Sequence, residues 1–300
     1  MRDLVRKAYR GITEPRLLAR QCNKLYYRHL GDQEATVDIF GADWDTLVIL
    51  DACRYDVFAD RCELPGRLEQ RRVRSSATVE FHRQYVDGAD LTDTVYVTAN
   101  PQLRRHQHEL DVRLHEIVDI WETGGWDDEL STVPPEPVVE AALQAHDRFP
   151  DKRLVVHFMQ PQHPYIGPEG RSELPIDSIG HFWKRVRTGE IDVETDVIRR
   201  AYEENLDIVL DGVRQLFDEL EGKTVVTADH GEMMGERGGP VPIAEYGHPR
   251  GLRTPELVTV PWLVYQNGPR RSVRAGETAA TTEARADQTV RDRLRDLGYA

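Results

Sequence analysis

Two short apolar runs that each lead into an aspartate constrain the fold of this chain most strongly. Thr46–Leu50 (TLVIL) is followed by Asp51, and Thr224–Thr227 (TVVT) leads through Ala228 to Asp229 and His230. Continuous β-branched runs of this length are typical of strands buried in a parallel sheet. Because ligands bind beyond the carboxyl ends of such strands, the sequence predicts a site where these polar residues meet.

Further strands and helices alternate along the chain. Three more runs have strand character, and three segments have apolar residues at helical spacing; the strands are 95–98, 153–158 and 258–265, and the helices are 137–148, 194–220 and 285–297. Pro261 restricts the last strand to a sheet edge or to a start that tolerates proline. Residues 102–122 have a polar helical character, which places His106, His108 and His115 at the surface. The alternation predicts an α/β protein with a mostly parallel sheet.

The charge balance excludes one class of partner. The net charge of −13 argues against nucleic acid, since no basic surplus exists to displace counterions. Only five of the 39 basic residues are lysine. An acidic, arginine-rich chain is typical of salt-adapted organisms such as haloarchaea, and coding bias at high GC content gives the same composition.

Cysteine usage and hydropathy bear on the compartment. Cys22, Cys53 and Cys62 have irregular spacing, which favours reduced thiols over a disulfide framework. No apolar run reaches the ~20 residues of a membrane span, and the N-terminus lacks the apolar region of a secretory signal. These features predict a cytoplasmic protein.

The N-terminal 30 residues differ from the rest in charge, with eight basic side chains against two acidic ones. A basic amphipathic helix of this kind can lie on an anionic membrane surface, although it more commonly packs on acidic residues of its own protein. We therefore expect a basic helical extension over residues 1–40 and a catalytic domain over residues 41–300, with peripheral membrane contact through residues 1–30 as the alternative to packing.

Several residues near strand ends are candidates for a site. The guanidinium of Arg54 suits phosphate or sulfate oxygens, and pairing with Asp56 or Asp60 is the structural alternative. Ser75 and Ser76 have N-cap character, and Thr78 then falls in the first helical turn. The helix dipole there favours an oxyanion, and a capping cluster without chemistry is the structural alternative. His163 and His248 follow strand-like or turn-rich segments, whereas His157 lies inside a strand and reads as a core residue.

The stretches TLVILD, SSATVEF, HPY, TADHGEMMGE, YGH and VPWLVY together resemble the alkaline phosphatase superfamily, on its sulfatase and phosphoethanolamine or phosphoglycerol transferase side, over roughly residues 44–299. The resemblance implies a three-layer α/β/α sandwich. It matches Asp51, Asp229 and His230 to metal ligands. It matches Thr78 to a metal-bound nucleophile, and His163 and His248 to substrate-binding and leaving-group histidines.

The sequence departs from parts of this pattern. SSATVEF lacks the cysteine that sulfatases convert to formylglycine, and HFMQPQHPY lacks the aspartate of a second metal site, which implies one divalent ion: Mn²⁺, Zn²⁺, Ca²⁺ or Mg²⁺. Ser76 remains the rival of Thr78 as nucleophile, or a substrate-binding residue together with Arg54.

Three hypotheses follow. The first is a metal-dependent hydrolase or transferase of phosphate esters or diesters. The second is a sulfatase-like hydrolase without formylglycine, and the third is a non-catalytic metal-containing relative that binds an anionic glycan or lipid head group.

Overall fold

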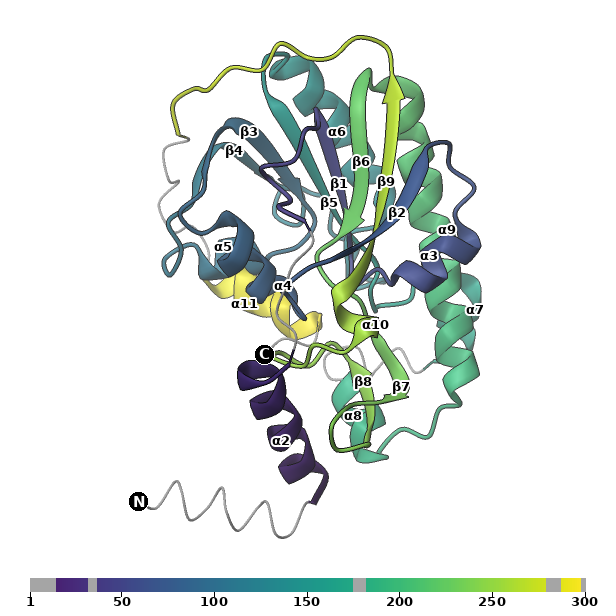
Figure 1. The fold of residues 1–300 in the computed structure, drawn as a ribbon. Coiled ribbons are helices and arrows are strands. Elements are labelled where there is room, and N and C mark those ends of the chain that lie inside the picture. Colours follow the sequence, from purple (N-terminus) through teal and green to yellow (C-terminus); the bar gives the residue numbers. More distant parts are fainter. Residues whose placement is uncertain (1–14, 32–36, 175–181, 279–286, 298–300) are drawn as a thin grey trace.

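A seven-stranded sheet with the order β2-β9-β6-β1-β5-β3-β4 forms the centre of the protein (Figure 1). The computed structural model describes residues 15–31, 37–174, 182–278 and 287–297. The strands of the sheet are β1 (Thr46–Asp51), β2 (Arg67–Arg72), β3 (Asp90–Thr98), β4 (Arg113–Asp119), β5 (Arg153–Pro161), β6 (Gly222–Ala228) and β9 (Thr259–Asn267). β1 pairs in parallel with β5 and β6, whereas β9 is antiparallel to both of its neighbours. The predicted mostly parallel sheet is confirmed.

Helices flank this sheet, and side-chain alternation along β5 shows which elements cover each face. Phe158 lies 3.8 Å from the Cβ that Gly212 of α9 would carry, while the neighbouring His157 meets the ring of His82. Successive strand residues point to opposite faces, so α9 and the segment around His82 lie on different sides. The helices are α2 (Pro15–His29), α3 (Tyr55–Arg61), α4 (Thr78–Phe81), the π-helix η1 (His82–Val86), α5 (Gln102–His106), α6 (Pro135–Arg148), α7 (Pro168–Glu173), α8 (Phe182–Thr188), α9 (Thr195–Glu219), α10 (Pro255–Val258) and α11 (Asp287–Asp296).

The helix predicted over residues 102–122 is wrong beyond its first turns. α5 ends at His106, and residues 113–119 form β4 at one edge of the sheet. Among the described strands, β4 pairs only with β3, and three of its seven residues are charged, so it lacks the apolar run that marks the central strands. The strand at the opposite edge, β2 (RLEQRR), was not predicted because it also lacks an apolar run. Charged residues are common on edge strands, because they discourage pairing with another chain.

Pro261 lies near the start of β9, which is the second of the two predicted positions, a sheet edge or a strand start that tolerates proline. β9 itself is not an edge strand, because it lies between β2 and β6. The pairing with β6 reaches only to Leu263, so Pro261 has a ladder partner on the β2 side alone, Gln70. A residue without a backbone N–H is therefore tolerated here.

A two-stranded hairpin of β7 (Met233–Arg237) and β8 (Ala244–Gly247) lies beside the carboxyl end of β6, and α2 packs against it (Figure 1). Arg20 Nε donates to Glu245 Oε1 at 2.8 Å, and Asn23 exchanges two hydrogen bonds with the backbone of Val241. α2 thus packs on an acidic residue of the same chain, while residues 1–14 lie outside the described part. The division at residue 40 stays a prediction.

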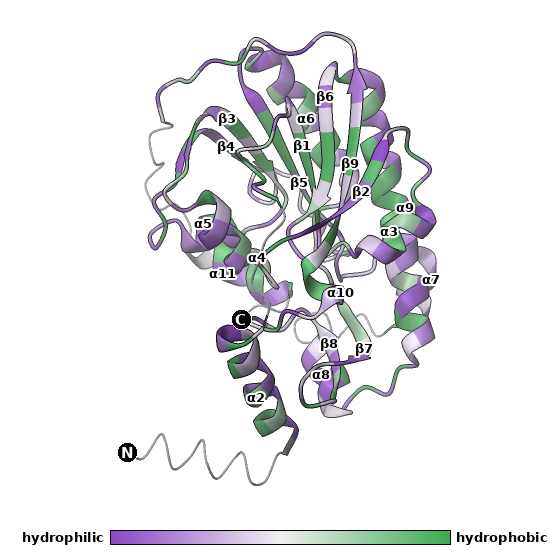
Figure 2. Cartoon of the chain, in the orientation of Figure 1, coloured by the Kyte–Doolittle hydropathy of each residue, from purple (hydrophilic) through white to green (hydrophobic). Residues whose placement is uncertain are grey.

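The outer surface of α2 carries apolar side chains. Leu18 and Leu25 are each more than half exposed, and Figure 2 shows hydrophobic patches along this helix. Contact with a membrane surface stays a prediction. Within the described ranges, no helix combines the length and hydropathy needed to cross a bilayer. All three cysteines are free thiols, as predicted.

Candidate active site

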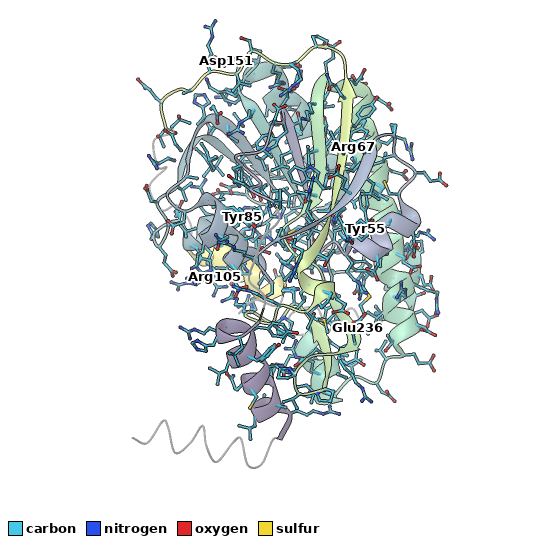
Figure 3. The ribbon with its side chains drawn as sticks, in the orientation of Figure 1. Tyr55, Arg67, Tyr85, Arg105, Asp151 and Glu236 are labelled. Carbon is cyan, nitrogen blue, oxygen red and sulfur yellow. The ribbon has the colours of Figure 1, made fainter. Side chains whose placement is uncertain are left out.

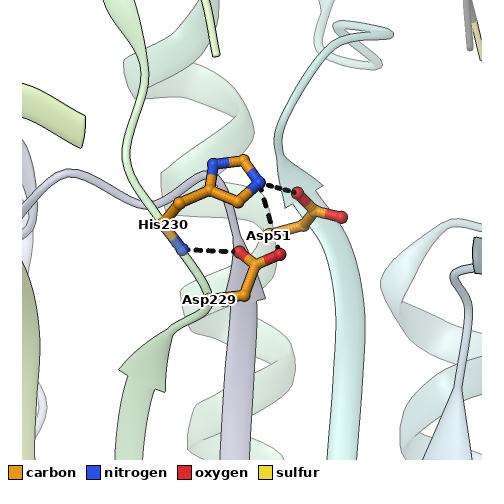
Figure 4. Close-up of side chains that lie close together, drawn as sticks. All are labelled: Asp51, Asp229 and His230. Atoms are coloured by element: carbon orange, nitrogen blue, oxygen red, sulfur yellow. Dashed lines mark hydrogen bonds and ion pairs between the residues drawn. The ribbon is translucent and has the colours of Figure 1, made fainter. Parts of the chain in front are cut away.

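The two predicted strand ends meet at the centre of the sheet. β1 ends at Asp51, and Asp229 follows the end of its neighbour β6. His230 Nε2 lies 3.3 Å from Asp229 Oδ2 and 3.6 Å from Asp51 Oδ1 (Figure 4). All three side chains are fully buried. Their ligand atoms converge within 4.8 Å, which is a spacing that one metal ion can bridge.

Hydrogen bonds leave one atom of each side chain facing this point. Asp229 Oδ1 accepts the backbone N–H groups of Ala52 (3.1 Å) and His230 (2.9 Å), while Oδ2 has no hydrogen-bond partner among the described residues. Asp51 Oδ2 accepts Asn100 Nδ2 at 2.6 Å, and Asp51 Oδ1 is similarly without a partner. Buried polar atoms are normally satisfied, so two such carboxylate oxygens side by side fit a cation between them.

The imidazole of His230 is oriented for the same purpose. Its Nδ1 lies 2.8 Å from the carbonyl oxygen of Gly231, which accepts the Nδ1–H and leaves the Nε2 lone pair directed at the carboxylates. Metal-binding histidines commonly have this second hydrogen bond. Burial, the largest cause, lowers the pKa of His230 and keeps the ring neutral. Two carboxylates and one imidazole suit Zn²⁺, Mn²⁺, Ca²⁺ or Mg²⁺, and the donor set does not select one.

The carboxylates repel each other without a cation. The pKa of Asp51 is raised well above its usual range, first by burial and then by the charge of Asp229. A divalent cation at the point of convergence would remove this repulsion, so the electrostatics agree with the geometry.

Strain in the backbone accompanies the turn after β1. Ala52 has a φ of +59°, a left-handed conformation that costs a residue with a Cβ about 1–3 kcal/mol. Asp229 Oδ1 holds its N–H, and Tyr202 donates a hydrogen bond to its carbonyl oxygen at 2.8 Å. The turn is therefore fixed by the ligand side chain itself.

Thr78 is a hydroxyl residue that reaches the candidate metal ligands. It begins α4, as predicted, and its Oγ1 lies 3.4 Å from His230 Nε2 and 3.5 Å from Asp51 Oδ2. Its side chain is almost fully buried. The short helix continues into the π-helix η1, a distortion frequent at functional sites.

Ser76 has a different set of contacts. Its hydroxyl donates to Glu80 Oε2 at 2.9 Å and accepts the N–H of Gly251 at 3.0 Å. The structure thus places Ser76 in a network that links the start of α4 to the loop after β8. Thr78, rather than Ser76, contacts the ligand set.

His248 lies next to the ligands, with its ring centroid 4.7 Å from that of His230. Its Nδ1 is 3.0 Å from Oε1 of Glu232, a fully buried carboxyl whose pKa burial raises to about 8. His163 follows β5 and stacks on Phe182 at a centroid distance of 4.5 Å. Burial lowers the pKa of His248 to about 4 and that of His163 to about 3. Both rings are therefore neutral at pH 7 and offer N–H hydrogen bonds.

Arg54 is largely committed to other protein groups. Its Nε donates to Asp56 at 2.9 Å and its Nη1 to the carbonyl oxygen of Glu232 at 3.2 Å, and it also pairs with Glu236. Glu236 lies on β7, and Figure 3 labels it on the hairpin. The predicted alternative, pairing with Asp56, is what the structure has. Substrate binding by Arg54 stays a prediction that these contacts disfavour.

A cavity of about 410 Å³ opens beside this cluster, and His163 and His248 both line it. Six of its lining residues are basic and none is acidic: Arg20, Lys24, Arg105, Lys184, Arg187 and Arg250. Figure 3 shows Arg105 on α5, at the end of the sheet that faces α2. In a chain of net charge −13, this local excess favours an anionic ligand.

Sequence reasoning missed three parts of the site. Asn100, which holds Asp51, follows β3 as Asp51 ends β1, so the same strand-end signal could have found it. Glu232 belongs to the ADHGE stretch, where it was assigned no role. The basic residues of the cavity come from four separate segments, and only Arg20 and Lys24 had a signal, the general excess of basic charge in the N-terminal 30 residues.

Comparisons with known proteins gave structural matches only. Neither a protein-family model nor a curated protein sequence matched the chain. Among solved structures, the zinc-bound periplasmic domain of EptC from Escherichia coli is 14% identical, with a TM-score of 0.45 over 75% of this chain and 74% of that one. The lipooligosaccharide phosphoethanolamine transferase A from Neisseria meningitidis, an integral membrane protein, is 12% identical, with a TM-score of 0.47 over 73% of this chain and 47% of that one.

A phosphonate monoester hydrolase from Silicibacter pomeroyi is 15% identical, with a TM-score of 0.40 over 75% of this chain and 68% of that one. The transferase from Neisseria meningitidis is a phosphoethanolamine transferase, a kind of protein that the sequence resemblance also named. With identities and TM-scores this low, the likenesses carry no part of the argument on function. The predicted cytoplasmic location is contradicted, because the EptC match is a periplasmic domain, and we withdraw that prediction. Nothing in the structure bears on a salt-adapted origin, which stays a prediction.

Proposed function

We propose that this protein is a metal-dependent phosphoryl-transfer enzyme that acts on phosphate esters or diesters, with Thr78 as the nucleophile. One observation carries the proposal: the Thr78 hydroxyl lies beside Asp51 and His230, where Asp51 and Asp229 each leave one oxygen without a partner among the described residues. His248, whose ring lies next to that of His230, lines the basic cavity. Phosphoryl transfer requires mainly positioning and charge neutralisation, and this arrangement supplies both.

Asp51, Asp229 and His230 would hold the ion, with Thr78 beside it. A divalent ion bound there lowers the pKa of a neighbouring hydroxyl and polarises the phosphoryl group. Asp51 Oδ2, 3.5 Å away, is a carboxylate oxygen that can accept the proton of Thr78. The helix N-terminus at Thr78 adds a small favourable field for the alkoxide.

The chain's own residues then define two steps. In the first, Thr78 Oγ1 bonds to phosphorus while the bond from phosphorus to the leaving oxygen breaks, and the leaving alcohol takes a proton from water. His163 and His248 donate N–H hydrogen bonds to the oxygens of the transferred group and the leaving group. In the second, water or an acceptor hydroxyl bonds to phosphorus while the bond from phosphorus to Thr78 Oγ1 breaks. The attacking oxygen loses its proton to water, and Asp51 returns a proton to Thr78.

Phosphorus is favoured over sulfur as the reacting centre because of the residue at the nucleophile position. Formylglycine arises from cysteine, and this chain has Thr78 there. Cys53, the buried cysteine, is directed at the carbonyl oxygen of Arg54 and not at the ligands.

The test compares wild type with Thr78→Val, which keeps the shape of the side chain and removes the hydroxyl. Nitrophenyl phosphate, bis-nitrophenyl phosphate and nitrophenyl sulfate would be supplied with Mn²⁺, Zn²⁺, Ca²⁺, Mg²⁺ or EDTA. We expect metal-dependent turnover of a phosphate substrate and a loss of roughly 10³-fold or more in kcat for Thr78→Val, as for other nucleophiles. Mass spectrometry of quenched wild-type enzyme should locate one phosphoryl group on Thr78.

Ser76→Ala is the matched control, since Ser76 is a nearby hydroxyl residue without a contact to the ligands; it should keep most of the activity. Full activity of Thr78→Val, or a phosphoryl group on Ser76, would contradict the assignment of the nucleophile. Turnover of the sulfate alone would favour a sulfatase without formylglycine. Metal binding without any turnover would favour a non-catalytic relative.

A further inference from the structure

The basic cavity holds more positive charge than one reacting phosphate ester needs. Six Lys or Arg side chains line it, and no lining residue is acidic. The nearby carboxyls already have partners, because Glu245 pairs with Arg20 and Glu80 accepts from Ser76. The metal ligands and two histidines are available to the reacting group, so the basic residues form a separate set beside them.

The basic residues are held in place by specific contacts. Glu245, fully buried on β8, binds Arg20, and Asn23 of the same helix is bonded to Val241. Arg187 of α8 donates to the carbonyl oxygen of Tyr246, the next residue on β8, at 3.0 Å. One short strand therefore positions basic residues from two helices that are more than 150 residues apart in the chain.

Burial and crowding make this arrangement costly without an anion. The pKa of Lys24 is lowered, mainly by burial and next by Arg20. The pKa of Arg187 is lowered by the same two causes in the same order. No hydrogen bond or ion pair of the described residues involves Lys24, so its ammonium is placed to receive a ligand.

We propose that the cavity bounded by α2, α8 and the loop after β8 binds a second anionic group of the substrate. The substrate class would then be a phosphate ester or diester that carries another phosphate beyond the reacting one. This inference rests on the proposed function for the identity of the reacting group. A cavity of about 410 Å³ falls in the range that holds a whole small ligand, which leaves space for such a group. α2, which sequence analysis placed outside the catalytic domain, becomes a specificity-determining element.

The first experiment measures binding without catalysis. Inorganic pyrophosphate would be titrated by calorimetry into the full chain in EDTA, with wild type, Thr78→Val and the double variant Lys24→Met/Lys184→Met. We expect wild type and Thr78→Val to bind equally, and the double variant to bind at least roughly tenfold more weakly. Methionine keeps an unbranched apolar stem, so a change in affinity reports the charge.

Lys223→Met is the matched control, because Lys223 pairs with Asp43 at the amino end of β6, away from the cavity. It should bind pyrophosphate as wild type does. Absence of binding by wild type in EDTA, or equal affinity of wild type and the double variant, would overturn the proposal.

The second experiment measures catalysis. A nitrophenyl phosphodiester whose alcohol carries a second phosphate would be compared with the same diester without it. The second phosphate should lower the KM of wild type at least roughly tenfold with little change in kcat, and the double variant should lose this difference. Equal KM values for the two diesters would overturn the proposal. The affinity of Thr78→Val for pyrophosphate and its rate of substrate turnover are measured separately. Failure of the second-anion site would therefore appear in the affinity, and failure of the phosphoryl-transfer assignment would appear in the turnover.

Discussion

The candidate metal site and the basic cavity lie side by side, but they are built in opposite ways. Asp51, Asp229 and His230 are fully buried at the ends of two central strands that pair with each other. The cavity instead takes its residues from α2, α5, α8 and a loop, and several of these side chains are exposed to solvent. The difference teaches that the sheet fixes the reactive group, whereas added segments determine which molecule reaches it.

Among the changes that separate these two regions, Asp229→Asn should have the largest effect. This change removes a negative charge from the ligand set while keeping the hydrogen-bonding shape. We expect metal affinity and turnover to fall by more than about 100-fold, beyond the loss typical of a residue that only supports a ligand. Calorimetric titration of Mn²⁺ and Zn²⁺ into chelator-treated protein measures the affinity.

Asp43→Asn is the control for Asp229→Asn, since Asp43 is an exposed aspartate paired with Lys223 and Arg270. It should bind metal as wild type does. Pyrophosphate binding in EDTA should survive Asp229→Asn, which would separate the two regions. If Asp229→Asn kept wild-type metal affinity, the centre would lie elsewhere.

A smaller effect should come from Glu245→Gln, which breaks the pair that holds α2. Glu245 is fully buried and Arg20 is only 17% exposed, so loss of the charge leaves Arg20 poorly compensated. We expect the free energy that holds α2 against β8 to fall by about 2–3 kcal/mol, which is near the lower end of the cost of breaking a buried ion pair. Hydrogen exchange of the α2 amides measures it, and pyrophosphate affinity should fall with it.

The contrast for Glu245→Gln is Asp207→Asn, whose pair with Arg61 lies at the surface. That variant should cost no more than about 1 kcal/mol. Metal affinity should be unchanged in both. Unaltered exchange of α2 in Glu245→Gln would show that other contacts hold the helix.

The smallest effect concerns stability in acid and comes from His82, whose ring contacts that of His157. Burial and the neighbouring His157 lower the pKa of His82 to about 3, from 6.5 in an unfolded chain. Between these values the unfolded chain binds the proton and the folded chain does not, so the free energy of unfolding falls as the pH drops below about 6.5. The free energy of unfolding of His82→Phe should therefore decrease less between pH 7.5 and pH 5 than that of wild type, by up to about 2 kcal/mol.

Urea denaturation in EDTA at pH 7.5, 6 and 5 measures the slope for His82→Phe. His108→Phe, at an exposed position, should leave the slope as in wild type. An identical pH dependence in wild type and His82→Phe would mean that His82 is not held neutral in the fold.

The sequence indicated the cluster of Asp51, Asp229 and His230 better than it indicated the cavity, for a physical reason. Asp51 and Asp229 each follow a continuous apolar run, and the pairing of parallel strands brings such ends together whatever the rest of the chain does. Arg20 and Lys24 had only a general signal, an excess of basic charge, and their place depends on contacts with Glu245 and Val241 more than 200 residues away. The strand β4 was predicted as helix because edge strands lack the patterns on which the prediction relied. The predicted surface position of His106 is wrong, because this residue is buried at the end of α5, where it lines the cavity.

The pairing of β1 with β6 has a consequence for how the protein folds. The hydrogen bond from Ala52 to Asp229 closes a loop of 177 residues, and Thr78 meets His230 across 152. Contacts of such long sequence separation form late and slow the folding of a chain. An ion held by Asp51, Asp229 and His230 would therefore have no site on partly folded chains and would bind only after most of the sheet has assembled. Since a ligand that binds only the native state stabilises it by mass action, a chelator should lower the melting temperature of the whole sheet, not of one loop.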